Sequence, residues 1–431
     1  MSSVRVEAYR SLDAAGHLAE AVAALNLASR RPAPYFTFSY MTTFLAHDEF
    51  AEPGTQPLLL AAFRGDELVG FLALRRRPLR LYGLPSVKIE FLVTHDVERP
   101  TLVARPEDEA VCSEAFWRHL VERERGWSFV ELMEQEAQSP LLPPDWVAGH
   151  GFWVRRYENN PNSTIRLDHE DVASYFKTLG SNHRRGVRVH SNRLLDAGEA
   201  EVVLSRDPRA LVPLLELYVD IENRSWKKGT RAAVARHPER LAFFRALSKP
   251  GQVPALWYVF FLLDGLPIAA HLNGSFGKTV YLLEMVFDED YRDLSPGKLM
   301  NLITVGETLA TGGRELNLLG NFAKQKERWE AVITDTSSIQ VFRWHSLFSI
   351  KAHLGDLTRK VKPAAPSQRE TIHNLSKPQR ESEEAPVAAR PPREPERRRC
   401  AESLAALERE GATLTRLRGP DLAARLPFPR K

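Results

Sequence analysis

The chain has very few cysteines and lacks the sequence motifs of several common enzyme classes. Only Cys112 and Cys400 occur among 431 residues, so a disulfide framework and a cysteine-based zinc site are both excluded. No Gly-x-Ser-x-Gly elbow, Walker loop or dinucleotide fingerprint occurs, and the 13 histidines show no His-x-x-x-His spacing. We therefore expect no hydrolase triad of that type, no P-loop and no bound metal.

Long apolar runs are also missing. No window reaches the about 18 consecutive apolar residues that a transmembrane helix needs, and residues 1–12 contain no apolar core of signal-peptide length. The composition, 43% hydrophobic and 26% charged, is that of a globular protein. These absences predict a cytoplasmic protein with no transmembrane segment.

Positive charge is concentrated near the C-terminus. From Arg359 onward there are 17 Lys and Arg against 10 Asp and Glu, which leaves a net charge of −3 on the preceding residues. The body therefore lacks the positive footprint of a DNA-binding protein. Seven prolines lie between Pro363 and Pro395, so we expect residues 362–431 to be a disordered basic tail, in which residues 401–410 form at most a short helix that does not pack.

The same order of elements is expected twice: a hairpin, a strand, a helix and a strand. The hairpin turns are Arg64-Gly65-Asp66-Glu67 and Asp264-Gly265. The other expected elements are strands 87–93 and 128–133 around helix 107–124, and strands 280–287 and 315–319 around helix 299–310. This order indicates a divergent internal duplication. The predicted fold class is α/β (α+β), with mixed, mostly antiparallel sheets flanked by helices, in two units at residues 1–160 and 161–361.

A phosphate-binding turn is predicted where strand 280–287 leads into the next helix. Ser295, Pro296, Gly297 and Lys298 stand at the start of that helix. The first N–H groups of a helix have no partner within the helix and point toward an anion placed there. Lys298 would add a positive charge. The alternative interpretation is ordinary helix capping by Ser-Pro.

Two titratable residues are candidates for proton transfer. Glu284 stands in the middle of the apolar strand 280–287, where burial would raise its pKa and make it a usable base for an amine. A solvent-facing position in an alternating strand is the alternative. His271, in the second strand of the hairpin, is a second candidate base, and a buried structural histidine is its alternative.

The span from Leu167 to Arg343 resembles the FemAB/CelD-like branch of the GNAT acyltransferase superfamily. The resemblance depends on the order of loose motifs rather than on any one of them. These motifs are Ser181-Asn182-His183-Arg184-Arg185, Ser225-Trp226-Lys227, the hairpin, the turn from Tyr291 to Gly297, and the run from Lys326 to Trp329. The usual phosphate loop of GNAT enzymes, Gln/Arg-x-x-Gly-x-Gly/Ala, is replaced by Ser295-Pro296-Gly297.

The resemblance implies an N-acyltransferase made of two GNAT-like units, with the working site in the second. Acetyl-CoA or another acyl-CoA would be the co-substrate, with its pyrophosphate at Gly297. The acceptor would be an amine of a small molecule or a cell-envelope precursor, held in a groove between the halves and attacking the thioester directly. The implied substrate-binding residues are Asn182, Arg184, Trp226, Lys326, Arg328 and Trp329, of which the last three would clamp an anionic substrate or cofactor. The alternatives are a solvated face for the first two, a core position for Trp226, and surface charge beside a packed Trp for the last three.

Other functions remain open at this point. FemAB-type proteins take an aminoacyl group from tRNA, and the basic run from Arg184 to Arg193 is compatible with an RNA donor. A non-catalytic accessory protein of polysaccharide biosynthesis is the third interpretation, because a fold does not fix a function. His95-Asp96, in a predicted loop, is a weak candidate for an acceptor contact.

Overall fold

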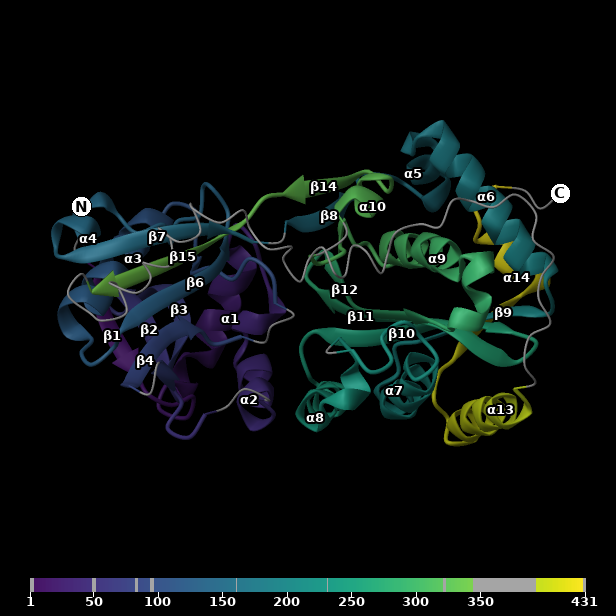
Figure 1. Ribbon diagram of the computed structural model, residues 1–431, viewed down its shortest axis with the longest axis horizontal. Helices are drawn as coiled ribbons and strands as arrows, with labels where there is room; N and C mark the ends of the chain where they lie inside the picture. Colours follow the sequence, from purple (N-terminus) through teal and green to yellow (C-terminus); the bar gives the residue numbers. More distant parts are fainter. Residues whose placement is uncertain are drawn as a thin grey trace.

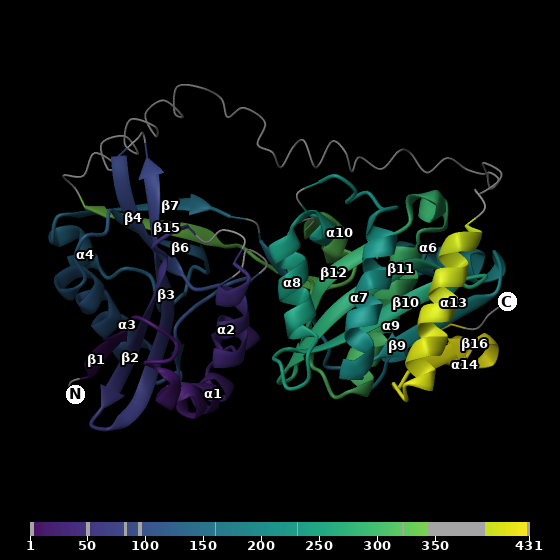
Figure 2. The same ribbon diagram turned by 90° about the horizontal axis from the view of Figure 1, so that it is seen from below.

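Two α/β halves lie side by side in the computed structural model (Figures 1 and 2). The structure describes residues 4–48, 52–81, 84–93, 97–159, 161–230, 232–320, 323–343 and 393–428. Each half is built on one large mixed sheet. The predicted fold class is therefore confirmed.

The first sheet has the strand order β1-β2-β3-β4-β6-β15-β7, with the short β5 paired to β3. All neighbours are antiparallel except β4 and β6, which run parallel. The strands are β1 (Arg5–Tyr9), β2 (Gln56–Arg64), β3 (Glu67–Leu81), β4 (Leu84–Phe91), β5 (Val103–Ala104), β6 (Phe129–Gln135), β7 (Phe152–Glu158) and β15 (Ser337–Arg343).

The second sheet has the order β14-β8-β13-β12-β11-β10-β9-β16, and its one parallel pair is β12 and β13. The predicted hairpin of β10 and β11 is confirmed, with Asp264 and Gly265 at φ values of 50° and 75° in the turn. The strands are β8 (Asn162–Arg166), β9 (Ala200–Ser205), β10 (Ala255–Leu263), β11 (Leu266–Phe276), β12 (Thr279–Phe287), β13 (Glu315–Asn317), β14 (Ala331–Thr334) and β16 (Thr415–Arg418).

The two sheets share one topology and exchange a strand. Next to the parallel pair, each sheet continues with an antiparallel strand that directly follows, in the sequence, a strand of the other sheet. β15 follows β14 and lies between β6 and β7, and β8 follows β7 and lies between β13 and β14. In Figure 1 the green β15 runs among the blue strands of the first half. Residues 337–343, which lie within the predicted unit 161–361, thus pair in the first sheet.

Helices cover both faces of the second sheet. Helix α9 lies on one face, and α7 and α8 lie on the other (Figure 1). Helix α7 begins at Pro208, with the Asp207 side chain accepting a hydrogen bond from the Arg209 N–H at 3.0 Å. The helices are α1 (Ala19–Ala28), α2 (Phe38–Ala46), α3 (Glu109–Arg118), α4 (Asp145–Gly149), α5 (Val172–Thr178), α6 (Ser181–Asp196), α7 (Pro208–Glu222), α8 (Pro238–Leu247), α9 (Pro296–Ala310), α10 (Ala323–Glu327), α13 (Glu394–Arg409) and α14 (Gly419–Ala424).

The C-terminal segment differs from the prediction of a disordered tail. In residues 393–428 the chain forms α13, β16 and α14, and β16 pairs antiparallel with β9. Helix α13 lies beside α7 (Figure 2) and buries Cys400, Leu404 and Leu407. These residues share one helix face, and that face supplies the apolar surface that the composition of the whole tail concealed.

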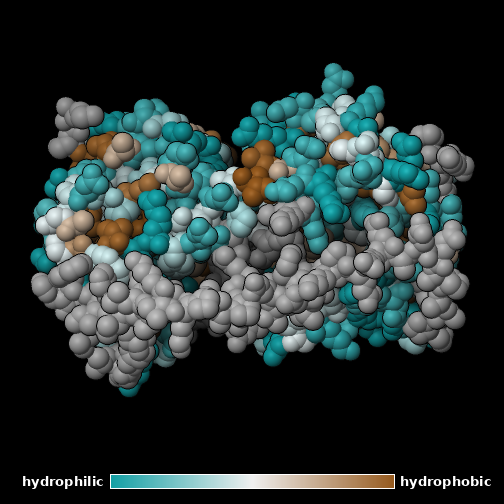
Figure 3. All heavy atoms as spheres, turned by 45° about the horizontal axis from the view of Figure 1, so that its top comes forward, coloured by the Kyte–Doolittle hydropathy of each residue, from teal (hydrophilic) through white to brown (hydrophobic). Residues whose placement is uncertain are grey.

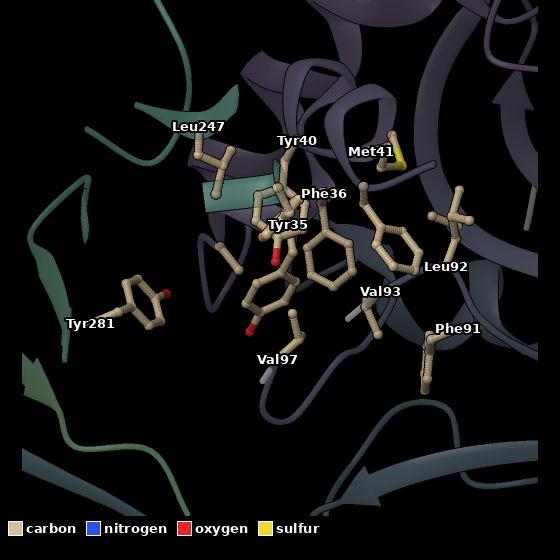
Figure 4. Packing of buried hydrophobic residues seen from close by; sticks show 14 of the residues in the cluster. Tyr35, Phe36, Tyr40, Met41, Phe91, Leu92, Val93, Val97, Leu247 and Tyr281 are labelled. Atoms are coloured by element: carbon tan, nitrogen blue, oxygen red, sulfur yellow. The ribbon is translucent and has the colours of Figure 1, made fainter. Parts of the chain in front are cut away.

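One continuous apolar core joins the halves. It contains the interior of the first half together with the face of the second sheet that carries α7 and α8, and α9 packs on a separate core on the other face. The Tyr40 and Phe243 rings, one from each half, lie 5.4 Å apart, and Figure 4 shows the first half's side chains facing Tyr281 and Leu247. On the face shown in Figure 3, the coloured residues are mostly hydrophilic, with separate hydrophobic patches. Among the described residues no helix combines the length and hydropathy needed to cross a membrane.

Candidate functional site

The parallel strands β12 and β13 separate soon after they pair. Their register joins Thr279 to Glu315, Val280 to Leu316 and Tyr281 to Asn317 and goes no further, while β12 continues to Phe287. Beyond Tyr281 this edge of β12 has no strand partner in the described part of the chain. Its backbone groups are therefore available to a ligand. Met285 lies in this stretch with 38% of its surface exposed, although β12 is an inner strand.

The turn after β12 ends at the start of α9. Ser295 adopts the left-handed conformation, with φ at 51°, and its side chain makes no capping hydrogen bond. A Cβ added at Gly297 would meet no heavy atom within 4 Å. The alternative of simple capping by Ser295 is therefore not what the structure contains. Open space adjoins the helix N-terminus, where the N–H groups of the first turn lack partners in the helix.

Helix α6 lies across this helix start. A Cβ added at Gly186 would lie 4.0 Å from the Lys298 Nζ atom. Beside it, burial and then the Lys298 and Arg328 cations lower the pKa of His183 to about 4. The His183 ring meets the Trp329 ring edge-on at 4.8 Å, and its buried Nε2 has no partner among the described residues. His183, Lys298, Arg328 and Trp329 together are called the α9 cluster below.

The predicted clamp of Lys326, Arg328 and Trp329 is only partly formed. The Lys326 Nζ donates to the carbonyl oxygens of Leu318 and Leu319, both at 2.7 Å, and also to that of Gly320. Burial lowers the pKa of Lys326 to about 8. Lys326 thus holds the turn after β13. Trp329 is buried, and Arg328 is exposed.

Glu284 is buried in an ion-pair cluster. Its Oε2 accepts hydrogen bonds from Lys227 Nζ and, at 3.2 Å, from the Tyr218 hydroxyl, and its Oε1 pairs with Arg240. Burial alone would raise the pKa of Glu284, but Lys227 and Arg240 outweigh it and hold the pKa below its usual range. The expectation of a raised pKa was therefore wrong. Lys227 and Arg240 lie far from Glu284 in the sequence, so the residues around Glu284 gave no sign of them.

His271 lies on the other face of the sheet from Glu284. Its Nδ1 is 2.9 Å from the Thr304 hydroxyl of α9, whereas Glu284 faces Tyr218 of α7. Burial, with a smaller effect of Lys227, lowers the pKa of His271 to about 3, so the imidazole is neutral near pH 7. The two predicted bases therefore do not belong to one site.

Of the remaining predicted substrate contacts, Arg184 makes structural hydrogen bonds, whereas Asn182 and Trp226 are exposed. Arg184 Nη1 donates to the carbonyl oxygen of Leu179 at 2.6 Å and to that of Lys177, which ties α6 to the end of α5. Asn182 is exposed on α6. Trp226 is 40% exposed, and the Lys227 ammonium lies over its ring, 5.8 Å from the centroid. His95-Asp96, like Asn321 and Phe322, lies outside the described residues.

Sequence reasoning missed a carboxylate at the boundary between the halves. Glu134, at the end of β6, has φ at 55°, and its Oε2 accepts a hydrogen bond from the Arg99 N–H at 3.2 Å. Burial raises the pKa of Glu134 to about 7, against smaller opposing effects of Arg99. In the sequence, only the position of Glu134 directly after the predicted strand 128–133 could have marked it as a candidate site residue. In the described residues, no group of three or more histidine, cysteine or acidic side chains is arranged to hold a metal.

The family comparison agrees with this geometry. Residues 181–329 match the model of the acetyltransferase (GNAT) domain, a span that contains α6, the hairpin, the diverging pair β12 and β13, and the α9 cluster. A search of curated protein sequences gives no match.

Solved structures with a similar chain path include three proteins of low sequence identity. FemX is 12% identical, over 77% of this chain and 97% of FemX, with a TM-score of 0.45. A tandem GNAT protein from the clavulanic acid biosynthesis pathway is 15% identical, over 80% and 99% of the two chains, with a TM-score of 0.45. A conserved protein of unknown function from Bacteroides thetaiotaomicron is 12% identical, over 76% and 97%, with a TM-score of 0.46.

Likenesses of this size carry no argument about activity. The assignment depends on the family model and on the separation of the parallel strands, which lie in the same residues. The resemblance deduced from the sequence motifs is confirmed for this span. Residues 181–329 therefore match the acetyltransferase (GNAT) domain family both in sequence and in the order of their elements.

Proposed function

We propose that the protein is an N-acyltransferase that transfers an acyl group from acyl-CoA to an amine, and that the second half binds the acyl-CoA. The observation that carries this proposal is the separation of β12 from β13 directly beside an open helix N-terminus. A thioester lying along β12 would find free backbone N–H groups to hold its carbonyl oxygen. Its phosphates would reach the start of α9.

The α9 cluster fits the anionic end of coenzyme A. Lys298 and Arg328 supply two positive charges, and His183 lies within electrostatic reach of both. His183 is neutral near pH 7, so its Nε2 is available for a hydrogen bond rather than for charge pairing. Ser295, Pro296 and Gly297 provide a turn that a phosphate can approach closely. In this proposal the turn replaces the usual GNAT phosphate loop.

The acceptor amine would attack the thioester carbonyl directly, without a covalent enzyme intermediate. The partly exposed Trp226 indole lies next to Lys227 of the Glu284 cluster. The first half contacts β12 through the Pro32 carbonyl oxygen, which accepts a hydrogen bond from the Tyr281 hydroxyl. Glu284 is proposed as an anchor for Lys227 and Arg240, because a carboxylate with two cationic partners is a weak base. The amine would belong to a small molecule or to a cell-envelope precursor.

The test is binding of acetyl-CoA and of longer acyl-CoAs to the full chain, measured by calorimetry. Lys298→Glu reverses the charge beside the phosphates, and we expect it to weaken binding about tenfold or more, as for loss of a charged hydrogen bond. Lys278→Glu is the matched control, because Lys278 precedes the opposite end of β12. Equal affinities for wild type, Lys298→Glu and the control would reject the site.

An aminoacyl-tRNA donor is the second candidate, and it is favoured by one observation. Helix α6 packs against α9 and exposes Arg185, Arg188 and Arg193. A row of cations next to the donor site suits a long anionic donor. Binding of total tRNA with a steep salt dependence, together with no binding of acyl-CoA, would select this function over the first. Binding of neither donor would favour the non-catalytic interpretation.

A further inference from the structure

Glu134 and Arg99 form an unusual pair at the boundary between the halves. Both are non-glycine residues with left-handed backbones, at φ values of 55° and 52°, and the Arg99 N–H donates to the Glu134 carboxylate. Such conformations cost free energy and persist only where the surrounding structure enforces them. The pair therefore holds a carboxylate in a fixed place at the end of β6.

The Arg99 side chain extends from this place to β8, beside the point where β12 and β13 separate. Tyr281 of β12 is in register with Asn317 of β13, and Asn317 is in register with Thr164 of β8. Two segments of the first half touch this row of residues. The Arg99 guanidinium donates to the Thr164 hydroxyl at 3.4 Å, and the carbonyl oxygen of Pro32 accepts from the Tyr281 hydroxyl at 3.3 Å.

The charged groups around Glu134 leave its carboxylate without an ion pair. Glu136, two residues away, pairs with Arg31 at 2.8 Å and with Arg99 at 2.9 Å. Among the described residues Glu134 has the Arg99 N–H as its hydrogen-bond partner and no cation in salt-bridge contact. Tyr35, Glu98, Tyr281 and Lys326 are further titratable groups of this region, and the Tyr35 hydroxyl donates to the Glu98 carbonyl oxygen at 2.7 Å.

We propose that Glu134 of the first half accepts the proton of the acceptor amine as its nitrogen attacks the acyl group held by the second half. This inference rests on the proposed function. The ammonium form of the amine gives one proton to the Glu134 carboxylate. The nitrogen lone pair then forms the C–N bond, the C–S bond breaks, and the leaving thiolate takes the second proton from nitrogen. Glu134 returns its proton to solvent.

Glu134 has the pKa that this role requires, and Glu284 does not. A base for an amine needs a pKa near the working pH, and the pKa of Glu134 is raised to about 7, whereas that of Glu284 is held low by two cations. Of the carboxyl groups in the described ranges with a clear pKa shift, Glu134 alone is raised. The site is then shared between the two halves.

The experiment compares wild type with Glu134→Gln in the full chain. The readout is the free thiol released from acetyl-CoA in the presence of a panel of simple primary amines. We expect kcat to fall about a hundredfold, as for loss of a general base, with unchanged acetyl-CoA affinity and melting temperature. The rate of the wild type should rise with pH through about 7, where Glu134 loses its proton, and this acidic limb should vanish in the variant.

Two further variants separate proton transfer from a structural effect. Glu134→Asp keeps a carboxylate and should retain the acidic limb with part of the rate. Glu136→Gln breaks two ion pairs at the same boundary and should keep the acidic limb even if the overall rate declines. A Glu134→Gln enzyme within a few-fold of wild type, with its acidic limb intact, would overturn the proposal.

The failures of the two proposals are distinguishable. If wild type does not bind acetyl-CoA, the proposed function itself fails. If wild type binds acetyl-CoA but no primary amine releases thiol, the amine acceptor is wrong and the role of Glu134 is overturned while the donor site stands.

Discussion

The two halves share a topology but differ at the helix that follows the first parallel strand. In the second half this helix, α9, begins with Ser295-Pro296-Gly297-Lys298 and carries no acidic residue in its first turn. In the first half the corresponding helix, α3, begins at Glu109 after Asp108, and Asp108 pairs with Arg64 at 2.5 Å. Carboxylates at a helix N-terminus repel a phosphate and satisfy the helix dipole themselves. Of these two helix starts, only that of α9 therefore lacks the carboxylates that would repel the phosphates of the proposed donor.

A second comparison concerns buried carboxylates on equivalent strands. Glu90 of β4 is surrounded by Arg75, Arg77 and Lys88, all from β3 and β4. Glu284 of β12 takes its cations from elsewhere, namely from α8 and from the loop before it. The first cluster stabilises a sheet, whereas the second ties the loop and α8 to the face of β12 where the acceptor is proposed to bind.

The largest loss of stability should come from removing the C-terminal segment. This segment packs on the second half, and the described part of the first half has no equivalent of it. Truncation after Lys362 would expose the α7 surface that Leu404 and Leu407 cover and would free the edge of β9. Each large buried side chain contributes about 1.5–3 kcal/mol, so we expect the melting temperature to fall by about 5–10 °C. Leu404→Ala should give part of this loss and the exposed Glu402→Ala almost none. An unchanged melting temperature would mean that the segment does not dock in solution.

The next largest loss of stability should come from neutralising the buried carboxylates Glu284 and Glu90. Because one lies in each half, the two variants compare the halves directly. Glu284→Gln leaves Lys227 and Arg240 without their anion, and we expect the free energy of unfolding to fall by about 3–5 kcal/mol. Because its pKa is lowered in the folded state, the stabilisation by Glu284 is present above its unfolded pKa and is lost as the pH falls through its lower folded value. Urea unfolding of Glu284→Gln and Glu90→Gln at pH 7 and pH 3 tests this. The exposed pair of Glu216 and Arg245 provides the control, where Glu216→Gln should cost below about 1 kcal/mol.

The smallest effect on the free energy of unfolding should come from replacing Ser295 and Arg99, which have left-handed backbones, by glycine. The change should have opposite signs in the two halves. Ser295 makes no side-chain cap, so Ser295→Gly should relieve strain and raise the free energy of unfolding by up to about 1 kcal/mol. Arg99→Gly relieves the same strain but removes contacts to Glu136 and Thr164, and should destabilise the protein. Denaturant unfolding of both variants measures the two signs. A stabilised Arg99→Gly protein would remove Arg99 as a link between the halves.

Local signals predicted much of the fold. Asp264-Gly265 marked the hairpin, and Ser295-Pro296 marked the start of α9, because turn and helix-start chemistry depends on adjacent residues. The spacing of Cys400, Leu404 and Leu407 also carried a local signal, which the proline-rich composition around it outweighed. That packing could have been predicted from the helical periodicity alone.

Contacts between distant residues were not predictable in the same way. Lys227 lies 57 residues from Glu284, and Arg240 lies 44 residues from it, so nothing beside Glu284 in the sequence indicated a lowered pKa. The raised pKa of Glu134 likewise follows from burial at the boundary between the halves, which forms only in the folded chain. The pKa shifts that the sequence did not predict are those that come from tertiary neighbours.

The exchanged strands also constrain how the chain can fold during synthesis. The first sheet needs β15, whose residues 337–343 are made long after β1 to β7, so an emerging N-terminal half keeps an unfilled place between β6 and β7. Pairing across such a sequence distance is slow to form, and the unpaired edges are open to association with other chains. We therefore expect that neither half can be produced alone as a stable protein, and that the nascent chain depends on protection until residue 343 has left the ribosome.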